Sequence, residues 1–219
     1  MNYVKKGFLP AVGFALALAT PAAIAAEGAA PAPAAAPPAA QQMTPANVRG
    51  TIASLDNGVM VLKARDGSTI NVQLGEKTGV NTLSKAGLAD IKADSFVGVT
   101  ATTKGEDMHA VEVHIFPDAM RGAGEGHRPW DLMPGSTMTN ANITETVAKN
   151  DGKTLTLKYK DGEKKISVGP DTAVVTVAPG TKDDLKVGAK VFTIAMKAAD
   201  GSIRGVAVLV GKDGITPPM

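Results

Sequence analysis

The feature that most constrains the fold of this chain is an internal duplication. At an offset of 94 or 95 residues, Asn57-Gly58 meets Asp151-Gly152 and Asp66-Gly67 meets Asp161-Gly162. About eight such matches run in register over ~70 residues, which indicates a repeat. They include Asp90-Ile91-Lys92 with Asp184-Leu185-Lys186, Val97 with Val191, and Val111 and Val113 with Val206 and Val208. Two copies are too few for a solenoid. We therefore expect two small domains, each closing its own core.

Each copy is predicted to be all β. Segments such as VMVLKA (59–64) and TLTLKY (154–159) alternate or are rich in β-branched residues, and Asp-Gly or Asn-Gly pairs separate them. Such pairs are the strongest short-range signal for β-hairpins. About five strands and one helical turn in ~70 residues favour a barrel, because closure removes exposed strand edges. We predict two OB-like barrels in tandem, with an SH3-like barrel or an open meander as alternatives.

The domain boundaries follow from the duplication and from composition. Between the expected signal peptide and the first repeat lies an Ala/Pro-rich stretch with almost no large apolar side chain, typical of a disordered, extended arm. A Gly/Pro-rich segment joins the two repeats. We predict a signal peptide (1–25), a disordered arm (26–46), a first barrel (47–116), an inter-domain clasp segment (117–140), a second barrel (141–211) and a tail (212–219).

The first 25 residues predict export. Lys5 and Lys6 precede an apolar run, and Ala23-Ile24-Ala25 fits a small-x-small cleavage site. The run is too short to serve comfortably as a membrane anchor, which needs roughly 20 apolar residues. No later segment is apolar enough to span a membrane, so we expect a mature chain in the periplasm of a Gram-negative bacterium. The chain has no cysteine, which excludes disulfides, thiol catalysis and cysteine zinc sites.

The charge balance argues against nucleic acid as a partner. The chain carries 23 Lys+Arg and 21 Asp+Glu, and removal of Lys5 and Lys6 with the signal peptide leaves 21 of each. Only 4% of its residues are aromatic. Nucleic-acid binding calls for a basic face and for rings on which bases stack. We therefore expect no nucleic-acid partner, and instead another envelope protein or a small ligand.

The central segment, HIFPDAMRGAGEGHRPWDLMPGSTMTN (114–140), concentrates the unusual chemistry. His114, Glu125, His127 and Asp131 supply nitrogen and oxygen donors that suit zinc, copper or nickel. Nearby methionines would favour Cu(I) if several converged. The spacing of the histidines matches no strong metal motif. A transition-metal site is therefore one hypothesis, and otherwise no cofactor is expected.

Two other interpretations use residues of the same segment. Arg121, His127, Arg128 and Trp130 could hold a small anionic or sugar-like ligand between the domains, because pockets favour domain interfaces. Alternatively the segment is a clasp, with Trp130 buried in the groove between the barrels and the two arginines paired with Asp118, Glu125 or Asp131.

No catalytic motif is present. The sequence contains no G-x-S-x-G elbow, no phosphate-binding loop and no His-Glu-x-x-His. His127 and Asp131 with Ser136 form only a chance-level triplet. We therefore expect a protein that is not an enzyme.

The repeated pattern V-x-G-x-I, then NG, DG, T-x-V, D-I/L-K and A-x-x-V resembles small all-β domains of unknown function from exported bacterial proteins. It covers residues 47–116 and 141–210. The central segment and the ending VGKDGITPPM resemble one uncharacterised proteobacterial group with two tandem OB-like barrels. Relatives sometimes receive a metal-transporter permease label, which the lack of further membrane spans in this sequence opposes. The resemblance implies a fold but no functional residues.

Together these patterns predict an exported, periplasmic, non-enzymatic binding or scaffold protein built from duplicated β-barrels. One alternative is a metal-binding protein using His114 and His127. The other is a protein that binds a small anionic or sugar ligand between its barrels.

Overall fold

The computed structural model describes residues 43–149 and 152–218, which belong to one compact unit, Ala40–Met219. The predicted signal peptide (1–25) and the arm up to residue 42 lie outside the described residues. The predicted arm ends too late, because the first strand already begins at Thr44. Among the described residues, no helix has the length and apolar character needed to cross a membrane.

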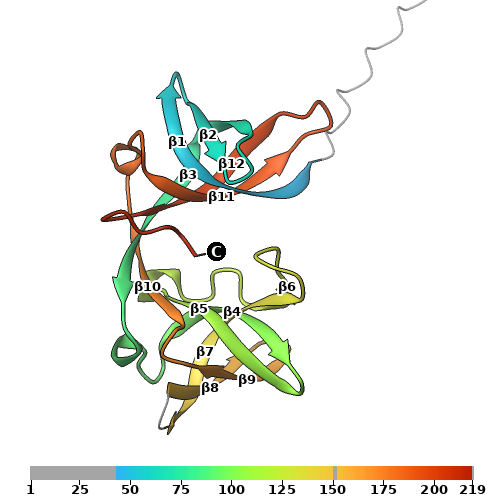
Figure 1. Ribbon diagram of the computed structural model, residues 1–219, viewed down its shortest axis with the longest axis vertical. Helices are drawn as coiled ribbons and strands as arrows, with labels where there is room; N and C mark the ends of the chain where they lie inside the picture. Colours follow the sequence, from blue (N-terminus) through green and yellow to red (C-terminus); the bar gives the residue numbers. More distant parts are fainter. Residues whose placement is uncertain (1–42, 150–151, 219) are drawn as a thin grey trace, which may run out of the picture. The chain divides into compact units, whose positions relative to one another are not determined.

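The described chain consists of twelve strands and three short 3-10 helices (Figure 1). The strands are β1 (Thr44–Asp56), β2 (Val59–Ala64), β3 (Thr69–Ala86), β4 (Phe96–Lys104), β5 (Asp107–Ile115), β6 (Gly126–Pro129), β7 (Ser136–Lys149), β8 (Gly152–Tyr159), β9 (Gly162–Val168), β10 (Ala173–Pro179), β11 (Lys190–Lys197) and β12 (Ile203–Gly211). The 3-10 helices are η1 (Leu88–Asp90), η2 (Asp118–Met120) and η3 (Lys182–Asp184). The prediction of an all-β barrel protein is confirmed.

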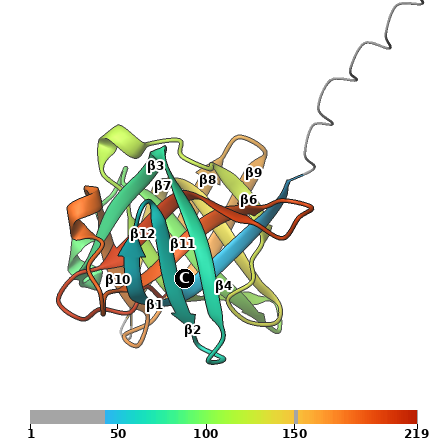
Figure 2. The same cartoon turned by 90° about the horizontal axis from the view of Figure 1, so that it is seen from above.

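Five strands from the two ends of the described chain close one barrel, here called the terminal barrel. Their order is β12-β11-β1-β2-β3, and a parallel pairing of β12 with β3 closes the circuit. Figure 2 looks down on these strands. Its core contains Ile52, Leu62, Val72, Val191 and Val208, each at most 2% exposed.

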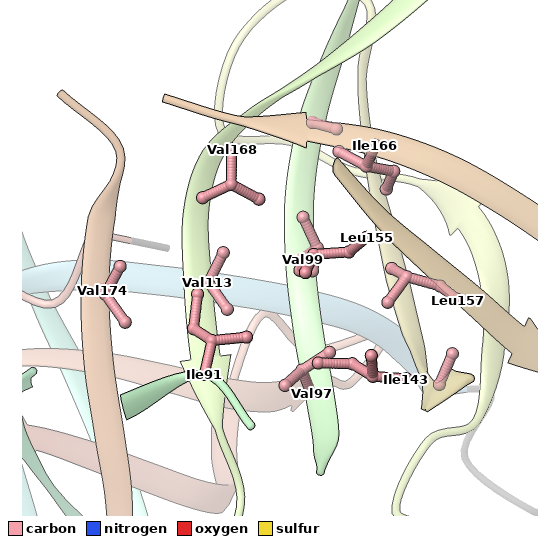
Figure 3. Packing of buried hydrophobic residues seen from close by; sticks show 12 residues of the cluster. Ile91, Val97, Val99, Val113, Ile143, Leu155, Leu157, Ile166, Val168 and Val174 are labelled. Carbon is pink, nitrogen blue, oxygen red and sulfur yellow. The ribbon is translucent and has the colours of Figure 1, made fainter. Parts of the chain in front are cut away.

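Five strands from the middle of the chain form a second circuit, here called the central barrel. Their order is β5-β4-β7-β8-β9, and Met108 and His109 of β5 close it by pairing with Ile166 and Ser167 of β9. Figure 3 shows its apolar side chains gathered between the strands. Ile143, Leu157, Val97 and Val113 form part of this core.

The strand pairing differs from the tandem arrangement predicted from sequence. The third strand of the first repeat, β3, is followed by η1 and by the hairpin β4-β5, and that hairpin pairs with β7 and β9 of the second repeat. In return, the hairpin β11-β12 of the second repeat pairs with β1 and β3 of the first. The boundaries 47–116 and 141–211 therefore do not delimit the barrels, and two OB-like barrels in tandem are not confirmed. We call this arrangement the strand exchange.

The length of β3 gives a physical reason for the exchange. It runs for 18 residues, whereas strands usually have 3–10 residues. Residues 69–73 of β3 pair with β2, and the rest of the strand continues past the end of that pairing, so the following hairpin starts away from β2. The end of β3 also pairs antiparallel with β10, which pairs in turn with β5. The seam β12-β3-β10-β5 thus joins both barrels in one continuous sheet.

Equivalent hydrogen bonds show that the duplication survives in three dimensions. The Thr78 hydroxyl accepts from the backbone N–H of Gly75 and donates to the carbonyl of Gly205, at 2.9 and 2.8 Å. The Thr172 hydroxyl, 94 residues later, accepts from Gly169 and donates to the carbonyl of Ala110, both at 3.1 Å. Each threonine therefore ties its own repeat to the hairpin received from the other repeat.

The predicted boundaries of the central segment also change. Strand β6 pairs with β7, and β7 begins at Ser136, so residues 136–140 belong to the central barrel rather than to a clasp over 117–140. The tail over 212–219 agrees with the end of β12 at Gly211, and its residue 219 lies outside the described part.

Candidate functional site: a cavity between the two barrels

A cavity of about 200 Å³ lies between the outer faces of the two barrels. Strands β5 and β7 of the central barrel, β6 and the loop before it, and β3, β11 and β12 of the terminal barrel all contribute to it. Its lining is mostly apolar and comprises Asn81, His114, Phe116, Met120, Ala123, Gly124, Arg128, Trp130, Met138, Asn140, Phe192, Ile194, Ala207 and Leu209.

On the terminal barrel, the side facing the cavity is apolar. We call the residues Phe192, Ile194, Ala207 and Leu209 the apolar face. In the register of β11 with β12, Phe192 lies opposite Leu209 and Ile194 lies opposite Ala207. Phe192 and Leu209 belong to a third hydrophobic cluster together with residues of β3 and β10.

On the central barrel, the equivalent positions are polar or empty. They are Gly98, Thr100, Glu112 and His114, here called the polar face. Gly98 lies opposite His114 and Thr100 opposite Glu112, the same register as in β11 and β12. The repeat offset accordingly matches Gly98 with Phe192 and His114 with Leu209.

The polar face contains a buried glutamate–histidine pair. Glu112 and His114 are 0% and 1% exposed, and Oε1 of Glu112 contacts Nε2 of His114. Neither carboxylate oxygen has a hydrogen-bond partner among the described residues. Buried charges are ordinarily paired and fully hydrogen-bonded. Burying this pair therefore costs the fold free energy. The sequence analysis identified only its histidine as a candidate.

The absence of a side chain at position 98 shapes the cavity beside this pair. A Cβ at Gly98 would stand 2.9 Å from Oδ1 of Asn140 and 3.0 Å from the ring of Phe116. Asn140 is 7% exposed and donates through Nδ2 to the carbonyl of Ala123 at 3.0 Å. Its Oδ1 has no partner among the described residues. A larger residue at position 98 would displace that oxygen.

Trp130 reaches the cavity from the loop after β6. Its ring packs against Phe192, with centroids 5.9 Å apart, and joins the hydrophobic cluster of Leu83, Val175, Val177 and Leu209. Trp130 thus packs against apolar residues as expected for a clasp, although its side chain is only partly buried. Its backbone is fixed because Trp130 N–H donates to the carbonyl of Ser136 at 2.8 Å. Its buried Nε1 has no acceptor among the described residues.

Arg128 lines the cavity next to Trp130. Its guanidinium carbon lies 5.6 Å from the centre of the Trp130 ring, and Nη1 donates to the carbonyl of Gly124 at 2.9 Å. Burial lowers the pKa of Arg128 from its usual value. No carboxylate in the described part of the chain pairs with it, so the predicted pairing of Arg128 with an acid is wrong.

The other predicted site residues anchor the segment away from the cavity. Arg121 donates to Asp118 at 2.7 Å, as predicted, and also to the side chain of Asn142 and the carbonyl of Asp94. Oε1 of Glu125 accepts from the backbone N–H of Lys160 at 3.0 Å. These contacts fix the segment on the central barrel.

Asp131 connects the same segment to the terminal barrel. Its carboxylate accepts from both terminal nitrogens of Arg49, at 2.7 and 3.1 Å, and from Asn47 at 3.1 Å. These hydrogen bonds, that of Arg49 first, lower the pKa of Asp131 below its usual value. Arg49 in turn lies 4.8 Å over the ring of Phe192. Arg49 lies opposite Phe192 in the register of β1 with β11, so the pair Arg49–Asp131 borders the apolar face on the same side of the sheet.

His127 lies on β6 and faces the side of the segment away from Trp130. Its Nδ1 is 2.8 Å from Oγ1 of Thr139, and its ring stacks on Tyr159 with centroids 6.4 Å apart. Burial, and then the charges of Lys164 and Arg128, lower its pKa. Neutral imidazole is therefore favoured, packed against an aromatic ring.

The residues proposed for a metal site do not converge. His114 contacts Glu112, Glu125 binds Lys160, His127 contacts Thr139 and Asp131 binds Arg49. Throughout residues 43–149 and 152–218, no group of three or more His, Cys, Asp or Glu is placed to hold a metal ion. The single proton of the Ser136 hydroxyl is directed at the carbonyls of Trp130 and Met133, 2.9 and 2.8 Å away, rather than at His127, so these residues do not form a Ser-His-Asp relay.

Of the four residues proposed for a small ligand, the cavity brings together two, Arg128 and Trp130, and adds His114 from the metal set. Sequence reasoning missed Gly98, Glu112 and Asn140. A signal for the first two was present, because the repeat offset sets Gly98 against Phe192 and Glu112 against Ala207.

Comparison with known proteins leaves the chain without a family assignment. No protein-family model, no curated protein and no solved structure matches it. The case for a function therefore depends on the cavity and its surroundings.

Proposed function

We propose that this chain is an exported, non-enzymatic binding protein whose ligand site is the cavity between the two barrels. The observation that carries the proposal is the divergence of the two repeats at one set of equivalent positions. A duplicated apolar face would have filled the space between the barrels, as Phe192 and Leu209 do on one side. On the other side Gly98 instead makes room for Asn140 and Phe116, which line the cavity together with His114.

The location of the unusual residues supports a binding role over a purely joining one. The seam of β3 and β10 already holds the two barrels in one sheet. Trp130 and Arg128 are therefore not required simply to keep the barrels together. Pockets at domain interfaces, mostly apolar with a few placed polar groups, are typical ligand sites. A volume of about 200 Å³ is below the range of roughly 300–1,000 Å³ for drug-sized ligands, so the ligand is small.

The export part of the proposal is supported by the N-terminal sequence pattern alone. The metal alternative gains no support, since its four residues have separate partners. Catalysis gains none either, because Ser136, His127 and Asp131 are held apart by their own contacts.

Native mass spectrometry of untagged protein taken gently from the bacterial envelope tests this function. The expected result is a mass excess of one small organic molecule per chain. The control is Ala207→Phe, which fills the cavity from the apolar face and should give the bare mass with an unchanged circular dichroism spectrum. A bare mass for the unmodified protein, or an equal excess in the Ala207→Phe variant, would refute a site in this cavity.

A further inference from the structure

Two buried groups that line the cavity lack a hydrogen-bond partner, and a third group carries a charge that no carboxylate meets. The indole Nε1 of Trp130 has no acceptor and Oδ1 of Asn140 has no donor among the described residues, where the half-buried guanidinium of Arg128 donates to the carbonyl of Gly124 but pairs with no carboxylate. Leaving a buried donor or acceptor unpaired costs ~1–3 kcal/mol, and more for a charged group. Together the three groups indicate a partner that supplies what each of them lacks.

The guanidinium and the indole define the charge of that partner. Arg128 presents N–H donors in a fixed fork that suits the two oxygens of a carboxylate. Trp130 adds one further donor, and the contact of the guanidinium with the indole ring keeps the two close together. The histidine of the polar face is already engaged with Glu112. Arg128 is therefore the charged side chain of the lining that a ligand would meet.

The remaining lining defines the body of the partner. Apolar surface is presented by Phe116, Met120, Met138, Phe192 and Leu209, and by Ile194, which is 39% exposed. An inorganic anion such as phosphate would leave this apolar surface without contacts. A carboxylate attached to a compact hydrocarbon body satisfies both parts of the lining.

We infer that the ligand is a small monocarboxylate with an apolar body, whose carboxylate is held by Arg128 and Trp130. This inference rests on the proposed function, since it names the chemical class that the cavity takes. Asn140 adds a preference within the class: a hydroxyl beside the carboxylate would donate to the free Oδ1.

The single tryptophan of the chain provides a direct probe, because it lines the cavity. Its fluorescence is titrated with cyclohexanecarboxylate, isovalerate and their 2-hydroxy or 1-hydroxy derivatives, and each acid is compared with its neutral amide. None of these compounds absorbs where indole does. We expect saturable binding of at least one acid, about tenfold or more tighter than its amide, because a charge-assisted hydrogen bond is lost in the amide.

Three variants assign the preference to Arg128. Arg128→Gln should reduce the affinity for the acid about tenfold or more and leave the amide nearly unaffected. Arg128→Lys should recover part of the loss. Arg65→Gln, which removes the same charge from an exposed position outside the cavity, should behave like the unmodified protein. Circular dichroism spectra confirm that each variant is folded.

The outcomes separate the inference from the function on which it rests. If amides bind as tightly as acids, or if Arg128→Gln leaves the acid preference unchanged, the ligand class is wrong while the cavity remains a binding site. If no acid or amide binds, and native mass spectrometry also gives a bare chain, both the class and the proposed function are refuted.

Discussion

Strands β4 and β5 and strands β11 and β12 occupy equivalent places in the two barrels, yet the faces that they turn to the cavity differ in chemistry. One is built of Phe192, Ile194, Ala207 and Leu209, the other of Gly98, Thr100, Glu112 and His114. Positions inside the barrels did not diverge in this way: Ile52 lies opposite Leu62 in one barrel and Ile143 opposite Leu157 in the other, each at most 1% exposed. A duplicated fold therefore keeps its cores and diverges where a site can form.

The largest effect is expected from replacing one residue of the Glu112–His114 pair with an apolar residue. His114→Leu installs the residue of the equivalent position but leaves Glu112 buried without its partner. Removal of one partner of a buried pair costs ~3–5 kcal/mol. We expect the free energy of unfolding, measured in urea, to fall by about that amount. The matched change Leu209→Ile should cost much less, since volume-conserving swaps usually lose under ~1.5 kcal/mol. Equal losses at the two positions would show that the polar face imposes no special penalty.

Replacing both residues of the pair should remove the loss of unfolding free energy. Glu112→Ala combined with His114→Leu reproduces the pair Ala207 and Leu209 of the other repeat. Replacement of a buried ion pair by apolar residues is often neutral or stabilising by ~1–4 kcal/mol. We expect the double variant to unfold at higher urea than either single variant and at least at the midpoint of the parent. A double variant as unstable as His114→Leu would mean that Glu112 and His114 stabilise the fold through contacts other than each other.

The two equivalent threonines should behave alike. Thr78→Ala and Thr172→Ala each remove a hydroxyl that accepts one backbone hydrogen bond and donates another across the strand exchange. Each hydrogen bond contributes ~0.5–1.5 kcal/mol, so each variant should lose ~1–3 kcal/mol of unfolding free energy. A single cooperative transition should persist in both, because the seam couples the barrels. Two separate transitions, with only one shifted by each variant, would contradict that coupling.

How much of this could be predicted from sequence depends on what each pattern encodes. The Asp-Gly and Asn-Gly turns and the β-branched segments specify hairpins, so the all-β barrel class followed from local chemistry. The strand exchange did not follow from local chemistry, because equivalent strands of two similar repeats offer similar partners. Pairing of β4 with β7 buries the same kinds of side chains as pairing of β4 with β1 would. Trp130 packs against apolar residues as expected, since a lone large ring in a linker must find apolar contacts.

The polar residues were harder to place for a related reason. His114 was assigned to a metal because its neighbours in sequence carry donors, whereas its contact, Glu112, is on the same strand, two residues earlier, and so on the same face. Arg49, which binds Asp131, lies 82 residues away in the chain. Such long-range partners leave no local pattern. The repeat alignment was the one source of information that marked the polar face.

The smallest expected effect concerns the pair Arg49–Asp131, which borders the apolar face of the terminal barrel. In the register with β4, Asn140 occupies the place that Arg49 has opposite β11. Arg49 and Asn47 lower the pKa of Asp131 in the folded chain. A depressed pKa of an acid adds stability that is fully present above the unfolded pKa of about 4 and is lost as the pH falls through the lower folded pKa. Since the side chain of Asp131 is 48% exposed, solvent screening limits the contribution to under ~1 kcal/mol.

The variant Asp131→Asn should therefore be slightly less stable than the parent at pH 7, and the difference in unfolding free energy between the two should shrink as the pH is lowered below 4. The same series at 1 M salt should show a smaller difference throughout. A gap that stays constant with pH and salt would mean that the link between the segment and the terminal barrel depends on shape and hydrogen bonding rather than on charge.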